Sequence, residues 1–277
     1  MQVGIFAKTF AGTQPATVMA AAAAAGYGGV QYNMACSGLA AMPLAIPPQH
    51  AQAIAQAATQ TRQSIFAVSG TYNMIHPDPV VRTEGHRRLQ VLAAAAVGMN
   101  TRLITLCTGS RNPHDQWTHH PDNVTPEAWR DLLASFEIAV GIADAHDVVL
   151  GVEPELANIV NSASAARRLI DELQSDRIRI VLDPANLFEC ASPQDRRALV
   201  DQAVDLLADR IVMAHAKDRD ATGAFATAGK GIIDFDHFLT TLHHAGFAGP
   251  VISHGLRADE AADVAAFLRQ KLGALGL

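Results

Sequence analysis

Four side chains with metal-binding atoms interrupt short apolar runs in the second half of the chain. They are Glu153 in GVEPE, Asp183 in IVLDPAN, His215 in VMAHAKD and His254 in VISHG. Each alone has an ordinary structural explanation, because an aspartate often caps a helix and a histidine often packs in a core. Together they favour a metal site, since buried carboxylates are costly unless a cation or hydrogen bonds compensate them.

The types of these side chains restrict the ion and the chemistry. Two carboxylates and two imidazoles suit one divalent ion, namely Mn²⁺, Co²⁺, Zn²⁺ or Fe²⁺, and suit Mg²⁺ less well. Lys217 follows His215 by two residues and shares its strand face, so it is either a base or an ion-pair partner of Glu155 or Asp183. Glu155 can orient a metal ligand or bind a substrate hydroxyl.

Two further side chains are candidates for contact with a substrate. Lys230 lies in the glycine-rich segment AGKG, where the backbone can approach a ligand closely. It either binds a carboxylate or phosphate or is an ordinary solvated lysine. His76 ends the segment YNMIHPD and is expected to line the pocket.

Apolar strands alternate with longer helical segments along the whole chain, without a linker or a charge block. Strands are predicted at Val3–Lys8, Gly29–Asn33, Ser64–Gly70, Arg102–Thr108, Val148–Pro154, Ile178–Pro184, Ile211–Lys217 and Pro250–Gly255. Eight strand–helix units in 277 residues predict an α/β fold, a single (β/α)₈ TIM barrel over residues 1–277. Because the C-terminal strand ends form the active-site face of such a barrel, the four residues would meet at its mouth.

Periodicity alone leaves an open, doubly wound sheet as the alternative fold. The chain has neither GxGxxG after the first strand nor GxxxxGK[ST], which weakens the dinucleotide-binding and P-loop alternatives. Helix starts are predicted at Thr125-Pro126, Ser192-Pro193 and Asp234. Two apolar stripes at helical spacing are predicted core contacts: Trp129, Leu132, Leu133, Phe136 and Val140, and Val264, Phe267, Leu268 and Leu272.

The composition restricts the partners and the location. The net charge is −6 with 12 histidines taken as neutral, which argues against nucleic acid because phosphate neutralisation needs clustered Lys and Arg. Cys36, Cys107 and Cys190 are odd in number and unevenly spaced, so we expect no disulfide framework and a cytoplasmic location. The apolar run Ala20–Ala25 is too short for a signal core or a membrane span, and no membrane partner is expected.

Several segments resemble the sugar isomerase/epimerase group of the xylose-isomerase-like barrels, which is related to endonuclease IV. They are GIFAKTF, AxxAGYGGVQ, GVEPE, VLDPANLF, HAKD, AGKGIIDFDHF and GPVISHGL, and they span nearly the whole chain. GVEPE, DPAN and HxKD in this order are a fairly specific signature of the fold and of its metal site. They do not specify a substrate.

The resemblance implies that Glu153, Asp183 and His215 bind the metal. The fourth ligand of the family is usually a glutamate on strand eight, where this chain has His254. In the 3-epimerases that glutamate and the one on strand five also exchange protons on opposite faces of the substrate, so this chain departs from a two-glutamate mechanism. Asn186 stands where the epimerases often carry a substrate-binding histidine, and it is a predicted substrate contact.

Lewis-acid catalysis is compatible with these departures, because a metal that chelates a carbonyl and a neighbouring hydroxyl stabilises an enediolate. We therefore expect a metal-dependent isomerase or epimerase of a sugar or keto-sugar, with Glu153 as the base that the resemblance implies and Lys217 as the alternative. A metal-dependent lyase, a dehydratase or decarboxylase of a keto-sugar or sugar acid, shares the enediolate and is the main alternative. Trp117 and Phe10 could pack against a sugar ring.

Two other classes of function make different demands on the chain. A repair nuclease of the endonuclease IV type needs more His and carboxylate ligands and a basic groove, and neither is evident in this acidic sequence. A non-catalytic sugar-binding barrel predicts that mutation of Glu153 or Asp183 leaves ligand affinity nearly unchanged. The expected partner is a small sugar-like molecule, and a homo-oligomer is plausible because family members commonly form dimers or tetramers.

Overall fold

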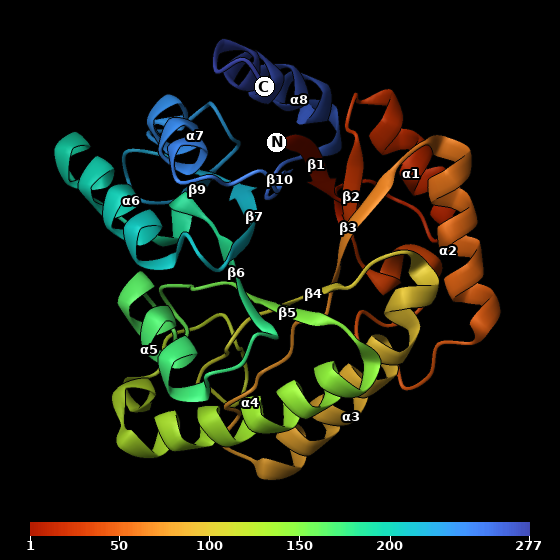
Figure 1. Ribbon diagram of the computed structural model, residues 1–277, viewed down its shortest axis with the longest axis vertical. Helices are drawn as coiled ribbons and strands as arrows, with labels where there is room; N and C mark the ends of the chain where they lie inside the picture. The colour runs from red at the N-terminus through yellow and green to blue at the C-terminus, as the bar shows by residue number, and fades with distance from the viewer.

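The computed structural model describes residues 1–277 and contains one closed barrel of parallel strands surrounded by helices (Figure 1). The strand order is β1-β10-β7-β6-β5-β4-β3-β2, and β1 pairs with both β10 and β2 to close the ring. The strands are β1 Gln2–Phe6, β2 Gly29–Tyr32, β3 Ser64–Ser69, β4 Leu103–Leu106, β5 Val149–Val152, β6 Ile178–Leu182, β7 Ile211–Ala216 and β10 Pro250–Ser253. The pairing of β1 with β10 excludes the open sheet and confirms the predicted (β/α)₈ TIM barrel.

All eight predicted strands are present, and each ends one or two residues before its predicted end. At Pro154 and Pro184 the reason is chemical, since proline has no N–H to donate to a neighbouring strand. The site residues Glu153, Asp183 and His254 therefore stand in the first loop residue after a strand, whereas His215 lies within β7.

Eight α-helices surround the barrel (Figure 1). They are α1 Pro15–Ala24, α2 Pro48–Thr61, α3 Pro79–Ala96, α4 Pro126–His146, α5 Ala163–Leu173, α6 Pro193–Leu207, α7 Phe235–His244 and α8 Ala261–Ala274. The three predicted helix starts are confirmed, because the side chains of Thr125, Ser192 and Asp234 accept hydrogen bonds from backbone N–H groups in the first turn. Short 3₁₀ helices occupy Ala7–Thr9, Met34–Ser37, Val97–Met99, Pro121–Val124, Pro184–Asn186 and Ala258–Glu260.

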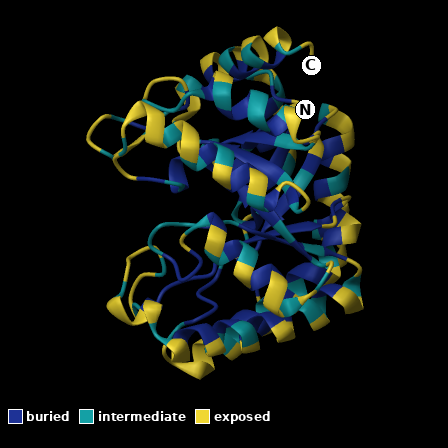
Figure 2. Ribbon diagram, turned by 60° about the vertical axis from the view of Figure 1, so that its left-hand side comes forward, coloured by how far each residue is buried: buried dark blue, intermediate teal, exposed yellow.

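The apolar core lies mainly between the strands and the helices, as the buried inner surfaces in Figure 2 show. The two predicted stripes on α4 and α8 belong to it: Leu132, Phe136 and Leu268 are fully buried, and the remaining stripe residues are buried or packed against the core. A second buried cluster of five side chains consists of Ala67, Leu103, Val181, Met213 and Ile252. Its members come from five different strands, so it fills the inside of the barrel.

The loop from β7 to α7 contains a small antiparallel hairpin, β8 Asp218–Arg219 and β9 Phe225–Ala226, that the sequence did not predict. Strands of two residues are too short to produce a recognisable hydrophobic period. The three cysteines are free. None of the helices combines the length and the apolar character that a membrane crossing requires.

Candidate active site

Two positions before each predicted site residue, a side chain or glycine faces the interior of the barrel. We call this layer of residues the floor of the site. Side chains alternate along a strand, so the residue two positions earlier points to the same side. These earlier residues are Gly151, Val181, Met213 and Ile252, which precede Glu153, Asp183, His215 and His254, respectively. Val181, Met213 and Ile252 pack together inside the barrel. A Cβ atom at Gly151 would lie 2.9 Å from Val181 Cγ2 and 3.0 Å from Leu103 Cδ1, so this position has no room for a side chain.

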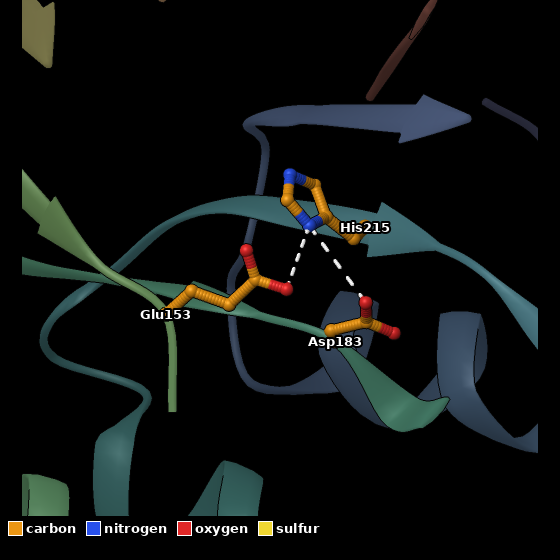
Figure 3. A group of neighbouring side chains, drawn as sticks. All are labelled: Glu153, Asp183 and His215. Atoms are coloured by element: carbon orange, nitrogen blue, oxygen red, sulfur yellow. Dashed lines mark hydrogen bonds and ion pairs between the residues drawn. The ribbon is translucent and has the colours of Figure 1, made fainter. Parts of the chain in front are cut away.

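Glu153, Asp183 and His215 converge above this floor (Figure 3). One metal-binding atom from each lies within 4.8 Å of the other two. His215 Nδ1 is 3.1 Å from Glu153 Oε1 and 3.7 Å from Asp183 Oδ2. Asp183 and His215 are fully buried, whereas the Glu153 side chain is 13% exposed and reaches the solvent side of the group. We call these three residues the acidic–histidine group.

Lys217 brings a positive charge between the two carboxylates. Its Nζ lies 2.8 Å from Asp183 Oδ2 and 3.3 Å from Glu153 Oε1. Asp183 Oδ1 accepts a hydrogen bond from the backbone N–H of Ala185 at 2.9 Å, while the buried Oδ2 accepts none of good geometry. The ion pair between Lys217 and Asp183, one of the two predictions for this lysine, is therefore confirmed.

The two oxygens of Glu153 have different surroundings. Oε1 is contacted by His215 Nδ1 at 3.1 Å, by Lys217 Nζ at 3.3 Å and by Asn186 Nδ2 at 2.9 Å. Oε2 has no hydrogen-bond partner in the protein, which leaves it available to a ligand. Asn186 is buried and donates to Glu153, so it orients the carboxylate. Its predicted contact with a substrate stays a prediction.

The ionised forms of this group stabilise one another. Burial opposes ionisation of Glu153 and Asp183, but the positive charges of His215 and Lys217 hold the pKa of both carboxyl groups below their usual values. Burial lowers the pKa of His215, and Glu153 and Asp183 more than compensate, raising it to about 9. Burial likewise opposes the charge on Lys217, yet the carboxylates raise its pKa above the usual value. These contacts therefore favour the protonated form of Lys217, and its role as a base stays a prediction.

Glu155 differs from its neighbour Glu153. Burial, together with the negative charge of Glu153, raises the pKa of Glu155 well above its usual value. Its carboxyl group forms no hydrogen bond within the protein. The pKa values of these two neighbouring carboxyl groups are thus shifted in opposite directions, a pattern found at acid–base sites.

His254 lies beside the acidic–histidine group without belonging to it. Its ring stacks on His215 with 5.3 Å between centroids and on Phe6 with 4.6 Å. Burial, reinforced by the positive charges of Lys217 and His215, lowers the pKa of His254 to about 3. The ring is therefore neutral, and its Nδ1 is buried without a hydrogen-bond partner. Its role as a fourth metal ligand stays a prediction.

Gln31 on β2 is a site residue that the sequence reasoning missed. Its Oε1 accepts a hydrogen bond from His215 Nε2 at 2.8 Å, and its Nε2 donates to Thr105 Oγ1 at 3.0 Å. With the Gln31 amide in this orientation, His215 carries a proton on Nε2 and turns Nδ1 toward the carboxylates. The available signal was a buried polar side chain at the C-terminal end of an apolar strand, the same signal that identified Asp183.

Asp218 shapes the loop that follows Lys217. Its carboxylate accepts hydrogen bonds from the backbone N–H groups of Arg219 at 2.8 Å, Gly229 at 3.0 Å, Gly231 at 2.9 Å and Ile233 at 2.9 Å. A Cβ atom at Gly231 would clash with the carbonyl oxygen of Arg219 and with this carboxylate. The motifs HAKD and AGKG, which carried the resemblance, therefore form one structural unit.

The hairpin of this loop carries Phe225, an aromatic side chain that is 58% exposed. The centroid of its ring lies 5.2 Å from Lys217 Nζ and 4.2 Å from Arg219 Cζ. Arg219 is held in turn by hydrogen bonds to the carbonyl oxygens of Ala185 and Gly223. An open aromatic surface thus adjoins the acidic–histidine group through Lys217. The sequence reasoning missed Phe225 because an isolated aromatic residue in a loop shows no periodic pattern.

The other predicted substrate contacts lie apart from this group. His76 accepts a hydrogen bond from Asp78 N at 3.0 Å, lies 3.2 Å from Pro113 O, and lines a cavity of 640 Å³ between α3 and the loops after β2, β3 and β4. Lys230 forms an ion pair with Glu260 at 2.7 Å on the surface. Neither side chain contacts the acidic–histidine group, and their roles in substrate binding stay predictions.

The acidic–histidine group fits a divalent cation. It offers two carboxylates and one imidazole nitrogen at close range, a mixed donor set suited to Mn²⁺, Co²⁺, Zn²⁺ or Fe²⁺. The opposite nitrogen of His215 is bound by Gln31, which is how metal-binding histidines are usually held. Asp183 Oδ2 is a buried acceptor without a good hydrogen bond, as expected for an atom that serves a cation.

Acidic and imidazole side chains gathered at the C-terminal ends of barrel strands are typical of the active sites of TIM-barrel enzymes. The chain belongs to the family of xylose isomerase-like TIM barrels, whose model matches residues 19–271. The resemblance inferred from GVEPE, DPAN and HAKD is thereby confirmed. No curated protein matches the sequence significantly.

Solved structures with the same fold include several sugar epimerases. The 3-keto-D-glucoside 4-epimerase YcjR from E. coli shares 16% identity at a TM-score of 0.78, over 98% of this chain and 99% of that one. A D-allulose 3-epimerase from Methylomonas sp. in complex with D-allulose shares 15% identity at 0.75, over 98% and 97%. An L-ribulose 3-epimerase shares 16% identity at 0.77, over 99% and 95%. At these identities the similarity establishes the fold alone.

Proposed function

We propose that this protein is a divalent-metal-dependent isomerase or epimerase of a sugar or keto-sugar that works through an enediolate. The observation that carries the proposal is the convergence of Glu153, Asp183 and His215 at the barrel mouth. The sugar epimerases among the similar structures support the choice of substrate class. When bound to this group, with His254 as a candidate fourth ligand, Mn²⁺, Co²⁺, Zn²⁺ or Fe²⁺ would act as a Lewis acid on a carbonyl and its neighbouring hydroxyl.

The protein's own residues supply the proton transfer. Glu153 is ionised, Asn186 holds its Oε1, and its Oε2 is free to accept the proton from the carbon beside the carbonyl. The electron pair of the broken C–H bond then passes into the enediolate. Glu155 follows Glu153 by two residues, and its raised pKa favours the protonated form, which would return a proton to the substrate. Lys217 supplies a positive charge beside the site.

Phe225 gives this site an apolar surface. Sugars present C–H faces as well as hydroxyl groups, and such a face packs well on an exposed aromatic ring. Because the Phe225 ring lies within 5.2 Å of Lys217 Nζ, a substrate held at the acidic–histidine group would extend across it. We therefore add Phe225 to the proposed substrate-binding residues.

A metal-dependent lyase is the second candidate, and His254 is the observation that favours it. The position on β10 where the 3-epimerases carry a second catalytic glutamate holds a neutral imidazole whose pKa is lowered to about 3. A neutral ring lacks the acidic second proton of an imidazolium and, unlike a protonated carboxyl group, is a poor acid toward the opposite face of the substrate. An enediolate formed here could instead expel the hydroxyl group of the next carbon as water, which is the step of a dehydratase. In a decarboxylase, a keto-acid would lose CO₂, and the electron pair of the broken C–C bond would form the enediolate.

Hydrogen exchange followed by NMR tests the proposal. The protein is stripped with a chelator, reloaded with Mn²⁺, Co²⁺, Zn²⁺ or Mg²⁺, and incubated in deuterated water with D-allulose, D-tagatose, L-ribulose, 3-keto-glucosides and keto-acids of sugars. We expect deuterium to enter the carbon beside the carbonyl only in the metal-loaded protein, and an epimer or isomer to accumulate. Loss of water or CO₂ from the product would identify the lyase.

Glu153→Gln is the decisive variant in this experiment, and Glu172→Gln is its matched control. Glu172 lies on α5, where its carboxylate pairs with Arg168 at the surface. The same substitution there leaves the acidic–histidine group unchanged. We expect the exchange rate to fall by at least about 100-fold in Glu153→Gln and to stay unchanged in Glu172→Gln. The absence of both metal binding and exchange in the wild-type protein would overturn the proposal.

A further inference from the structure

The ammonium group of Lys217 already occupies the cation position of the site. Lys217 Nζ contacts Asp183 Oδ2 at 2.8 Å and Glu153 Oε1 at 3.3 Å. These are the same two oxygens that lie closest to His215 Nδ1, as the dashed lines in Figure 3 mark. The Lys217 side chain is only 12% exposed, so the charge sits inside the group rather than at its edge.

An ammonium group and a divalent ion cannot share these oxygens. A transition metal binds carboxylate oxygens at roughly 2.0–2.2 Å. An ion at that distance from Asp183 Oδ2 and Glu153 Oε1 would lie against Lys217 Nζ, and the two positive charges would repel strongly in a buried site. Binding of the ion therefore favours movement of the ammonium group away from these oxygens.

Lys217 has a place to move to. The exposed ring of Phe225 lies 5.2 Å from its Nζ, at the open edge of the site. An aromatic face attracts an ammonium group. The Arg219 guanidinium already lies 4.2 Å from the centroid of this ring, and the ring is exposed, so water would screen the two positive charges from each other. A Cβ atom at position 255 would lie 3.6 Å from Cγ and Cδ of Lys217. Because this residue is a glycine, no side chain at this position obstructs the lysine.

We propose that Lys217 is the internal counter-cation of the metal-free site, and that a divalent ion binds by displacing its ammonium group from Asp183 and Glu153 toward Phe225. The inference rests on the metal site of the proposed function. Lys217 then stabilises the metal-free protein and weakens its affinity for metal, because the ion pairs must break each time an ion enters. The lysine selects for ions that bind carboxylates tightly enough to replace it.

Titration with Mn²⁺ by calorimetry tests this competition with Lys217→Met, which keeps the length of the side chain and removes its charge. Lys230→Met is the matched control, since Lys230 pairs with Glu260 on the surface of the same loop. We expect Lys217→Met to bind Mn²⁺ at least about tenfold more tightly than wild type. We also expect its Tm in EDTA to fall by roughly 5 °C or more, because two buried carboxylates lose their partner. Lys230→Met should match wild type in Mn²⁺ affinity.

The outcomes separate this inference from the proposed function. Equal Mn²⁺ affinities for wild type and Lys217→Met would overturn the inference and leave the proposed function standing. Binding by Lys217→Met but not by wild type would support the inference and overturn metal-dependent activity of the natural chain. Failure of both proteins to bind Mn²⁺ would overturn both.

Acetylation of wild-type lysines tests the movement itself and does not require a variant that folds without metal. The rate of modification of each lysine is measured by mass spectrometry with and without Mn²⁺. We expect Lys217 to react several-fold faster when Mn²⁺ is present, while Lys230, which is 55% exposed, keeps its rate. An unchanged rate at Lys217 on saturation with Mn²⁺ would overturn the displacement.

Discussion

The two sides of the barrel mouth use buried polar residues in different ways. Above β5, β6 and β7 the polar side chains are charged, contact one another, and include acceptors without a good hydrogen bond. Around the loop after β4, two buried neutral amides instead bind the loop backbone: Asn73 from the loop after β3 and Asn158 from the loop after β5. Asn73 bonds the backbone of Ser110 at 3.1 and 2.7 Å, and Asn158 bonds Gly109 N at 2.7 Å and Gln116 O at 3.1 Å.

This difference distinguishes buried polar residues that hold a loop from those that are suited to bind a ligand. A buried amide with both its donor and acceptor groups satisfied completes a structure and has nothing further to bind. Charged side chains concentrated in one buried place, by contrast, are stable only because the opposite charge is present. The acidic–histidine group with Lys217 is such a place, and the following predictions test the contrast from the largest expected effect to the smallest.

The charged side should make the stability of the metal-free protein depend on pH. The pKa of His215 is raised from its ordinary 6.5 to about 9, so protonated His215 stabilises the fold below pH 6.5 and this contribution is lost as the pH rises through 9. In EDTA, the unfolding free energy of wild type minus that of His215→Gln should fall by at most about 3 kcal/mol over this range. Urea unfolding at several pH values measures the difference. A difference that does not change with pH would contradict the raised pKa.

A hydrogen bond connects Gln31 on β2 to His215. Substitution of Gln31 should weaken metal binding, although Gln31 is not itself a proposed metal ligand. Gln31→Leu removes the hydrogen bond that fixes the ring, and we expect Mn²⁺ affinity to fall by about 10- to 100-fold. Gln63→Leu is the control, because Gln63 is also buried but bonds Tyr27 O at the opposite end of the barrel. Calorimetric titration with Mn²⁺ should distinguish the two variants, and equal losses would deny Gln31 a specific role.

The neutral side should affect stability alone. Asn158→Ala leaves the N–H of Gly109 and the carbonyl of Gln116 without their partners, and we expect a loss of about 1–3 kcal/mol in unfolding free energy. Asn161→Ala, at an exposed position in the same segment, should be nearly neutral. Mn²⁺ affinity should match wild type in both variants, and a large change in Asn158→Ala would show that the two sides of the mouth are coupled.

The fold was predictable because its signals are local and repeated. Each strand is a short apolar run, each helix carries a stripe, and caps such as Thr125 and Ser192 mark the boundaries. Closure of the barrel was not visible in these signals, since it depends on the pairing of β1 with β10 across nearly the whole chain. The resemblance to known barrels supplied that step.

The convergence of the acidic–histidine group was predictable for the same reason. Glu153, Asp183 and His215 interrupt apolar strands, and a barrel brings strand ends together. Gln31 and Phe225 were missed because their roles depend on contacts between distant segments, a hydrogen bond from β2 to β7 and a hairpin folded back over Lys217. Sequence spacing alone left two roles open for Lys217, a base or an ion-pair partner. The ion pair with Asp183 became visible only in the structure.

The four backbone hydrogen bonds accepted by Asp218 make the β7–α7 loop a self-contained piece of the molecule. Its anchor lies within the chain segment itself, next to the barrel, while residues 220–224 at the hairpin tip lie outside that anchor. The residues of the tip and Phe225 can therefore be replaced as a unit. The Asp218 carboxylate and the glycine-rich segment that donates hydrogen bonds to it would remain in place. Sequence changes confined to these residues would alter the surface beside Lys217 and leave the hydrogen bonds of Asp218 in place.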